Sequence, residues 1–90
     1  MGNTWNKTRL KTLCVMRYFV LHTDKEHPAN AKQIIAHLAT LGISAERKSI
    51  YADIAILREF GLRIDRHDHS YYYVPQKGDF MEETKSKLYR

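Results

Sequence analysis

Apolar residues recur at helical spacing in three successive segments of the chain and then switch to alternation. The first segment runs from about Lys7 to His22. It is apolar on nearly all sides, and a helix of this kind is buried on more than one side. Its inner face is predicted to be Leu10, Leu13, Cys14 and Leu21, and its other apolar face to be Val15, Met16 and Phe19.

A second helix is predicted after the loop that ends at Pro28. Asn30 is a good N-cap, and Gln33, three residues on, is its reciprocal partner in a capping box. Gly42 ends the helix, because glycine takes the left-handed conformation without a steric penalty. The inward stripe of this helix is Ala31, Ile34, Ile35 and Leu38.

Ser44 is predicted to cap a third helix, and Glu46 in its first turn suits the helix dipole. Gly61 ends it. Since only residues 41–44 would separate the second and third helices, the two are predicted to form a tight helix-turn-helix, whose second helix can enter a DNA groove. The inward stripe of the third helix is Ile50, Ile54 and Leu57.

The pattern then alternates, which is typical of strands. Leu62 and Ile64 alternate with polar residues, and Tyr71-Tyr72-Tyr73-Val74 is rich in strand formers. Between them, His67-Asp68-His69-Ser70 would form the polar tip of a β-hairpin, and Pro75 would close its second strand.

The predicted fold is therefore mainly α with a small β-hairpin: a winged helix-turn-helix, with three helices and the hairpin as the wing. Residues 1–75 would form this DNA-binding domain. Residues 76–90 would be a C-terminal linker or short helix. Asp79 and Glu82 have the spacing of another capping pair, which predicts a short helix from about Phe80 to Tyr89.

Composition narrows the function. Ninety residues allow one small domain, and a net charge of +5 favours an anionic partner. The single cysteine, Cys14, excludes an internal disulfide. No apolar run approaches the roughly 20 residues that a membrane span needs, and the N-terminus does not resemble a signal peptide. These features predict a cytoplasmic protein that does not enter a membrane.

Sites for catalysis are not evident. The chain has no glycine-rich phosphate loop and no pair of carboxylates placed for a cleft. His67 and His69 are short of the three or four ligands that zinc prefers. Cys14 lies among apolar residues, so it is interpreted as a buried structural thiol. We therefore predict no enzymatic activity, no cofactor and no metal.

The third helix is the candidate reader of DNA. Its outward residues would be Lys48, Ala52, Ala55 and Glu59, of which the alanines let a helix sit deep in the major groove. Lys48 and Ser49 lie near the N-terminal end, which usually meets base edges. Phosphates or the groove wall would be contacted by Arg47, Tyr51 and Arg58. The alternative is that the third helix is an ordinary amphipathic helix whose polar side faces solvent and binds nothing.

Other segments would hold the DNA backbone. The first helix offers Lys7 and Arg9, and the second offers Lys32 and Gln33 beside the free N–H groups of its N-terminus. The wing can lie along the backbone or dip into the minor groove. Its candidate contacts are Arg63, Arg66, His67 and His69.

The third helix and its end, residues 47–54 and 57–62, resemble the recognition helix of the N-terminal winged helix-turn-helix domain of WYL-domain transcriptional regulators, which is DeoR-like. His27-Pro28-Ala29-Asn30 and the residues after it are similar to the entry of that family's second helix, and Tyr72-Tyr73-Val74 to its second wing strand. Two departures stand out: the family usually has a basic residue where this chain has Ala52, and its members continue after the wing into an effector-sensing WYL domain.

The resemblance implies a bacterial or phage transcriptional regulator that binds double-stranded DNA, usually as a homodimer. We expect the regulator to be a repressor. An effector-sensing domain would follow in an intact protein of that kind. Two alternatives remain open: a winged-helix protein–protein interaction module in a larger assembly, and a non-specific architectural DNA binder. The apolar residues Val15, Met16, Phe19, Phe80, Met81 and Leu88 would either contact a partner or pack within the monomer.

Overall fold

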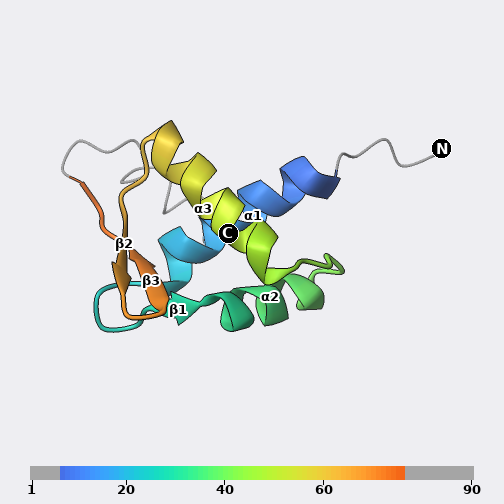
Figure 1. The fold of residues 1–90 in the computed structure, drawn as a ribbon, viewed down its shortest axis with the longest axis horizontal. Coiled ribbons are helices and arrows are strands. Elements are labelled where there is room, and N and C mark those ends of the chain that lie inside the picture. Colours follow the sequence, from blue (N-terminus) through green and yellow to red (C-terminus); the bar gives the residue numbers. More distant parts are fainter. Residues whose placement is uncertain (1–6, 77–90) are drawn as a thin grey trace.

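The computed structural model describes residues 7–76 and shows three helices and a three-stranded antiparallel sheet in this range (Figure 1). The helices are α1 (Lys7–His22), α2 (Ala31–Thr40) and α3 (Arg47–Phe60). The strands are β1 (Ala29–Asn30), β2 (Ile64–His67) and β3 (Ser70–Tyr73), in the order β1-β3-β2. The prediction of a mainly helical chain with a small β-hairpin is confirmed. The helix predicted near Phe80 to Tyr89 lies outside the described residues.

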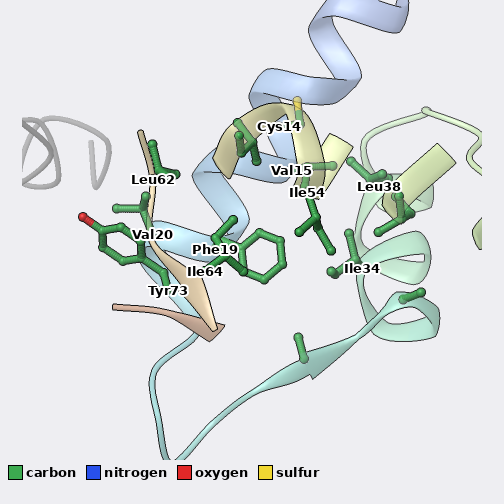
Figure 2. Close-up of a cluster of buried hydrophobic side chains, with 14 of the residues drawn as sticks. Cys14, Val15, Phe19, Val20, Ile34, Leu38, Ile54, Leu62, Ile64 and Tyr73 are labelled. Atoms are coloured by element: carbon green, nitrogen blue, oxygen red, sulfur yellow. The ribbon is translucent and has the colours of Figure 1, made fainter. Parts of the chain in front are cut away.

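α1 supplies the centre of the core. Phe19 and Val15 are fully buried, and Phe19 lies between the sheet residue Ile64 and the helix residue Ile54 (Figure 2). The predicted inner face was wrong for Leu10 and Leu13, which are 37% and 56% exposed. A helix that is apolar nearly all round does not show by composition which side faces the core, and here packing against α2, α3 and the sheet decides it.

α2 begins and ends as predicted. The Asn30 side chain accepts a hydrogen bond from the Gln33 backbone N–H, and the Gln33 side chain accepts one from the Asn30 N–H, both at 2.8 Å. At the other end Gly42 has a φ of +78°, and the N–H of Ile43 donates to the Leu38 carbonyl at 3.0 Å. This is the Schellman ending, and it buries Ile43 against the core.

α3 begins two residues later than predicted. Its N-cap is Glu46, not Ser44, and its first residue is Arg47. The Ser49 hydroxyl donates to the Glu46 carbonyl at 2.8 Å and accepts from the Glu46 N–H at 3.3 Å. Because Ser49 closes this turn on Glu46, Ser44 is left exposed in a connection that is longer than the predicted turn.

A buried ion pair joins α1 to α3. The Lys11 ammonium donates to one carboxylate oxygen of Asp53, and the Thr12 hydroxyl donates to the other at 2.8 Å. The Lys11 side chain is 10% exposed and that of Asp53 is 5% exposed. The Lys11 charge is therefore used inside the protein and does not face solvent, unlike that of Arg9.

The sheet contains one strand that the sequence did not predict. β1 has two residues, and it pairs Ala29 with Tyr71 and Asn30 with Ser70. Because β1 runs directly into α2, this pairing fixes the start of α2 beside the hairpin. The buried Thr23 makes a second link, since its hydroxyl donates to the Phe19 carbonyl at 2.7 Å and accepts from the Tyr73 N–H at 2.9 Å.

The hairpin of β2 and β3 is tighter than predicted. Ile64 pairs with Tyr73 at one end and His67 with Ser70 at the other, so the connection is Asp68-His69, with Asp68 at a φ of +56°.

None of the helices in the described part of the chain is long and apolar enough to cross a membrane.

Replacing Asp53 tests the buried ion pair. Asp53→Ala would leave the Lys11 ammonium buried without its partner, so we expect a loss of about 3–5 kcal/mol in the free energy of unfolding. Urea denaturation measures the loss. Glu59→Ala, at an exposed position on the same helix, is the control and should change it by less than about 0.5 kcal/mol. A similar small change for Asp53→Ala would contradict a structural role for the pair.

His37 gives the fold a pH dependence. Burial lowers its pKa below the usual 6.5, and the nearby charges of His22 and Arg17 lower it further. Since the unfolded chain then binds the proton more readily, stability is lost as the pH falls below about 6.5. Thermal unfolding between pH 7.5 and 5.5 should show a smaller decline for His37→Asn than for the parent chain. His69→Asn, at the exposed hairpin tip, should keep the parent decline.

Candidate nucleic-acid interface

The outer face of α3 has the composition predicted for it. Lys48, Ala52, Ala55 and Glu59 are all exposed, while Ile50, Ile54 and Leu57 are buried. The two alanines leave the middle of this face without long side chains. A recognition helix with a face of this shape can approach the floor of the DNA major groove closely.

The first turn of α3 presents Arg47 and Lys48 to solvent, at the N-terminal end of the helix, which is usually the end that meets base edges. Ser49 is less available than the sequence suggested. Its side chain is only partly exposed, and its hydroxyl bonds both backbone groups of Glu46. Any contact from Ser49 to a base would have to share that hydroxyl with the helix cap.

Three of the predicted DNA-contacting elements meet at one hollow. Its volume is about 360 Å³, and it lies where the start of α2, the first turns of α3 and the hairpin tip come together. The lining residues are Asn30, Ala31, Lys32, Arg47, Tyr51 and His69. Four of these were singled out from the sequence, and they come from three separate segments. The two permanent cations of the lining, Lys32 and Arg47, make the hollow suited to an anion.

The start of α2 contributes backbone donors as well as Lys32. The capping box uses the N–H groups of Asn30 and Gln33, so those donors are already paired. The side-chain oxygen of Gln33 is occupied in the same way, which leaves its amide N–H₂ to face solvent. The predicted phosphate clamp would therefore depend on Lys32 and on the first-turn N–H groups outside the capping box.

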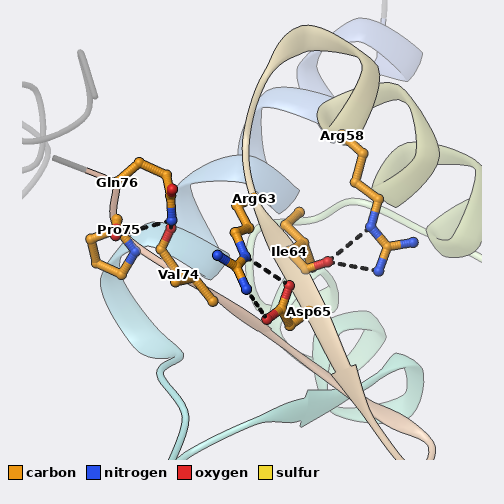
Figure 3. A network of polar contacts seen from close by, with 7 residues as sticks. All are labelled: Arg58, Arg63, Ile64, Asp65, Val74, Pro75 and Gln76. Atoms are coloured by element: carbon orange, nitrogen blue, oxygen red, sulfur yellow. Dashed lines mark hydrogen bonds and ion pairs between the residues drawn. The ribbon is translucent and has the colours of Figure 1, made fainter. Parts of the chain in front are cut away.

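Arg58 has a different position from the one expected of a phosphate contact. Its guanidinium donates two hydrogen bonds to the Ile64 carbonyl, at 2.9 Å and 2.7 Å (Figure 3). It also lies 5.8 Å from the centre of the Tyr71 ring, whose other neighbour is Tyr51 at 6.1 Å. Arg58 thus ties the end of α3 to β2, and Tyr71 ties the hairpin to the middle of α3.

The hairpin residues predicted to contact DNA differ in how they are placed. Arg63 donates to both carboxylate oxygens of Asp65, at 3.2 Å and 3.1 Å, and these hydrogen bonds raise the pKa of Arg63 (Figure 3). Its charge is largely offset, and it borders a different hollow. Arg66 donates to the Asp68 carbonyl at 2.8 Å, while His69 lines the same hollow as Lys32 and Arg47.

The first helix lies beside the connection to α3. Thr8 and Lys11 border a hollow with Gly42 and Ser44, so the start of α1 approaches the segment that leads into α3. Arg9 is exposed one turn or less from these residues, and it does not line the hollow at the hairpin tip.

Sequence reasoning missed Asp53 and Lys11 as partners and Arg58 as an anchor. A signal for the first pair was present. Asp53 falls within the apolar stripe of α3, and Lys11 falls at helical spacing before Val15 and Phe19. Two opposite charges that each interrupt an inward stripe are candidates for a buried pair. No comparable pattern marks Arg58.

His67 and His69 do not form part of a metal cluster. Within residues 7–76, no group of three or more potential metal-binding side chains comes together. His67 instead lies 3.7 Å from the Asp68 carboxylate.

Comparison of the chain with protein-family models, with curated proteins and with solved structures gave no match.

Replacing Arg58 tests its role as an anchor. A lysine cannot reproduce the two-pronged bond to the Ile64 carbonyl, so Arg58→Lys should lower the free energy of unfolding by about 1–2 kcal/mol. It should also speed amide hydrogen exchange in β2 and β3 more than in α2. Arg63→Lys is the matched control, because its partner Asp65 is on the solvent side of the same strand, and it should change stability by under about 0.5 kcal/mol.

Proposed function

We propose that this chain is a winged helix that binds double-stranded DNA and recognises a preferred sequence, as a transcriptional regulator does. The observation that carries the proposal is the hollow at which α2, α3 and the hairpin tip present Lys32, Arg47, Tyr51 and His69 together. A DNA-binding helix-turn-helix needs this arrangement, with one helix in the major groove and neighbouring segments on the phosphates.

The proposed mode divides the work between two sets of residues. Lys48 and Ala52 on α3 would meet base edges, since they lie at the centre of its exposed face. Lys32, Arg47 and Tyr51 would bind one phosphate strand as it passes the hollow. The hairpin would brace the backbone through His69 and Arg66.

The WYL-type resemblance supports the same proposal and adds expectations of its own. A regulator of that family would act as a homodimer in a bacterial or phage cytoplasm and would recognise two half-sites. A dimer would place two α3 helices about one helical turn of DNA apart, or a multiple of it. The homodimer, the repressor role and the effector domain stay predictions from the resemblance.

Selection of bound duplexes from a random pool tests the proposal directly. A preferred sequence is expected. Binding to it should weaken steeply with salt, because each phosphate contact releases counterions. No binding to any duplex, or binding that does not respond to salt, would contradict the proposal. Equal binding to all duplexes would favour the non-specific architectural alternative.

Single substitutions separate reading from backbone contact. Lys48→Ala should cost about 1–3 kcal/mol on the preferred site and relax the preference at one position. Arg47→Ala should weaken binding to all duplexes alike and reduce the salt slope by about 1. Fluorescence anisotropy at several salt concentrations measures both effects.

Lys25→Ala is the charge-matched control for these variants. Lys25 is exposed in the turn after α1 and borders a different hollow. Its loss should leave the sequence preference intact and change affinity little. If Lys25→Ala weakened binding as much as Arg47→Ala, attraction would come from net charge and not from the hollow.

A protein-interaction module is the second candidate, because α1 and α3 expose an apolar groove on another part of the surface. That alternative predicts no duplex preference in the selection.

A further inference from the structure

An apolar groove lies between the middle of α1 and the C-terminal half of α3. Its volume is about 260 Å³. The lining residues are Thr12, Leu13, Met16, Ile56, Leu57 and Phe60. Three large side chains on it are more than half exposed: Leu13 and Ile56 at 56%, and Phe60 at 62%.

An exposed apolar groove of this kind is expected to bind another apolar surface. Single exposed apolar residues are ordinary on protein surfaces, but a contiguous set marks a place where another apolar surface docks. The groove is separate from the hollow proposed for DNA, because the two share no lining residue. α1 also carries Arg9 and Arg17 exposed and has no acidic residue, so a partner with acidic groups would be complementary in charge.

The chain itself contains a segment with these properties. At about 100° per residue, Phe80, Met81, Thr84 and Leu88 would fall within about 100° of the circumference of a helix. Acidic residues accompany the beginning of this apolar face, at Asp79, Glu82 and Glu83. An amphipathic segment that lays its apolar side into a groove between helices is a common docking mode.

The described chain ends close to the groove. The N–H of Val74 donates to the Arg63 carbonyl at 2.9 Å, and Arg63 is three residues past Phe60. The end of α3 and the end of the described chain both lie at the upper left of Figure 1. Three extended residues, 77–79, span roughly 10 Å, and in the arrangement inferred below they carry the chain toward the Phe60 end of the groove.

We propose that residues 80–88 of the same chain dock as an amphipathic helix in the groove between α1 and α3. Phe80, Met81 and Leu88 cover Leu13, Met16 and Phe60, and the acidic residues lie toward the cations of α1. The proposal goes beyond DNA binding and does not depend on it. A second copy of the chain is the competing occupant.

Methionine methyl groups give a direct test. The chain has three methionines, of which Met16 lines the groove and Met81 belongs to the proposed helix. In the full chain labelled with ¹³C-methyl methionine, we expect a nuclear Overhauser effect between the Met16 and Met81 methyls. Sedimentation of the same sample should give the mass of a monomer.

Substitutions at two neighbouring positions, Leu88 and Tyr89, provide a test of the docked helix and its control. Leu88 lies on the apolar side of the predicted helix, and Tyr89 lies about 100° further round, outside it. Leu88→Ser should abolish the Met16–Met81 effect and raise amide exchange at residues 81–87 by roughly tenfold or more. Tyr89→Ser should preserve both signals.

Two results would overturn the proposal. One is the absence of the Met16–Met81 effect in the parent chain. The other is an effect seen only between separately labelled chains in a mixed sample, together with the mass of a dimer, which would assign the groove to a second copy. Because none of these measurements involves DNA, their outcome is distinct from that of the duplex selection.

Discussion

The buried pair of Lys11 and Asp53 constrains how α3 sits on the rest of the molecule. Two charges removed from water are tolerable only together, and a rotation of either helix would leave one of them buried alone, at a cost of several kcal/mol. With Asp53 held inward beside Ile50 and Ile54, the opposite side of α3 must face solvent. The exposure of Lys48 and Ala52 is therefore a consequence of a contact made on the other side of the helix.

The hairpin is fixed to the same helix by a second set of contacts. Arg58 reaches from the end of α3 to the Ile64 carbonyl, and the Tyr71 ring approaches both Arg58 and Tyr51. The short strand β1 joins the hairpin to the beginning of α2. These links bring three separate segments to one hollow and support the proposal that they act on one phosphate strand.

Much of the candidate surface was predictable from spacing alone. The inward stripe of α3 predicted its outward residues correctly, and the capping box at Asn30 and Gln33 placed the start of α2. The start of α3 was misjudged, because Ser44 is a favoured N-cap residue and Glu46 is not. In the structure the Ser49 hydroxyl bonds both backbone groups of Glu46, and the helix begins there. Arg58 looked like a phosphate contact because sequence does not show that a backbone carbonyl of β2 lies within its reach.

Local periodicity and glycine at positive φ specify which segments are helices, where α2 begins, where α2 and α3 end, and which side of α3 is apolar. Three other features depend on the tertiary structure: which side of α1 enters the core, the burial of Lys11, and the two-residue strand that completes the sheet. Those outcomes depend on residues far apart in the chain, as the pairing of Lys11 with Asp53 does. An apolar face or a lysine has the same local pattern whether its partner is water or another helix.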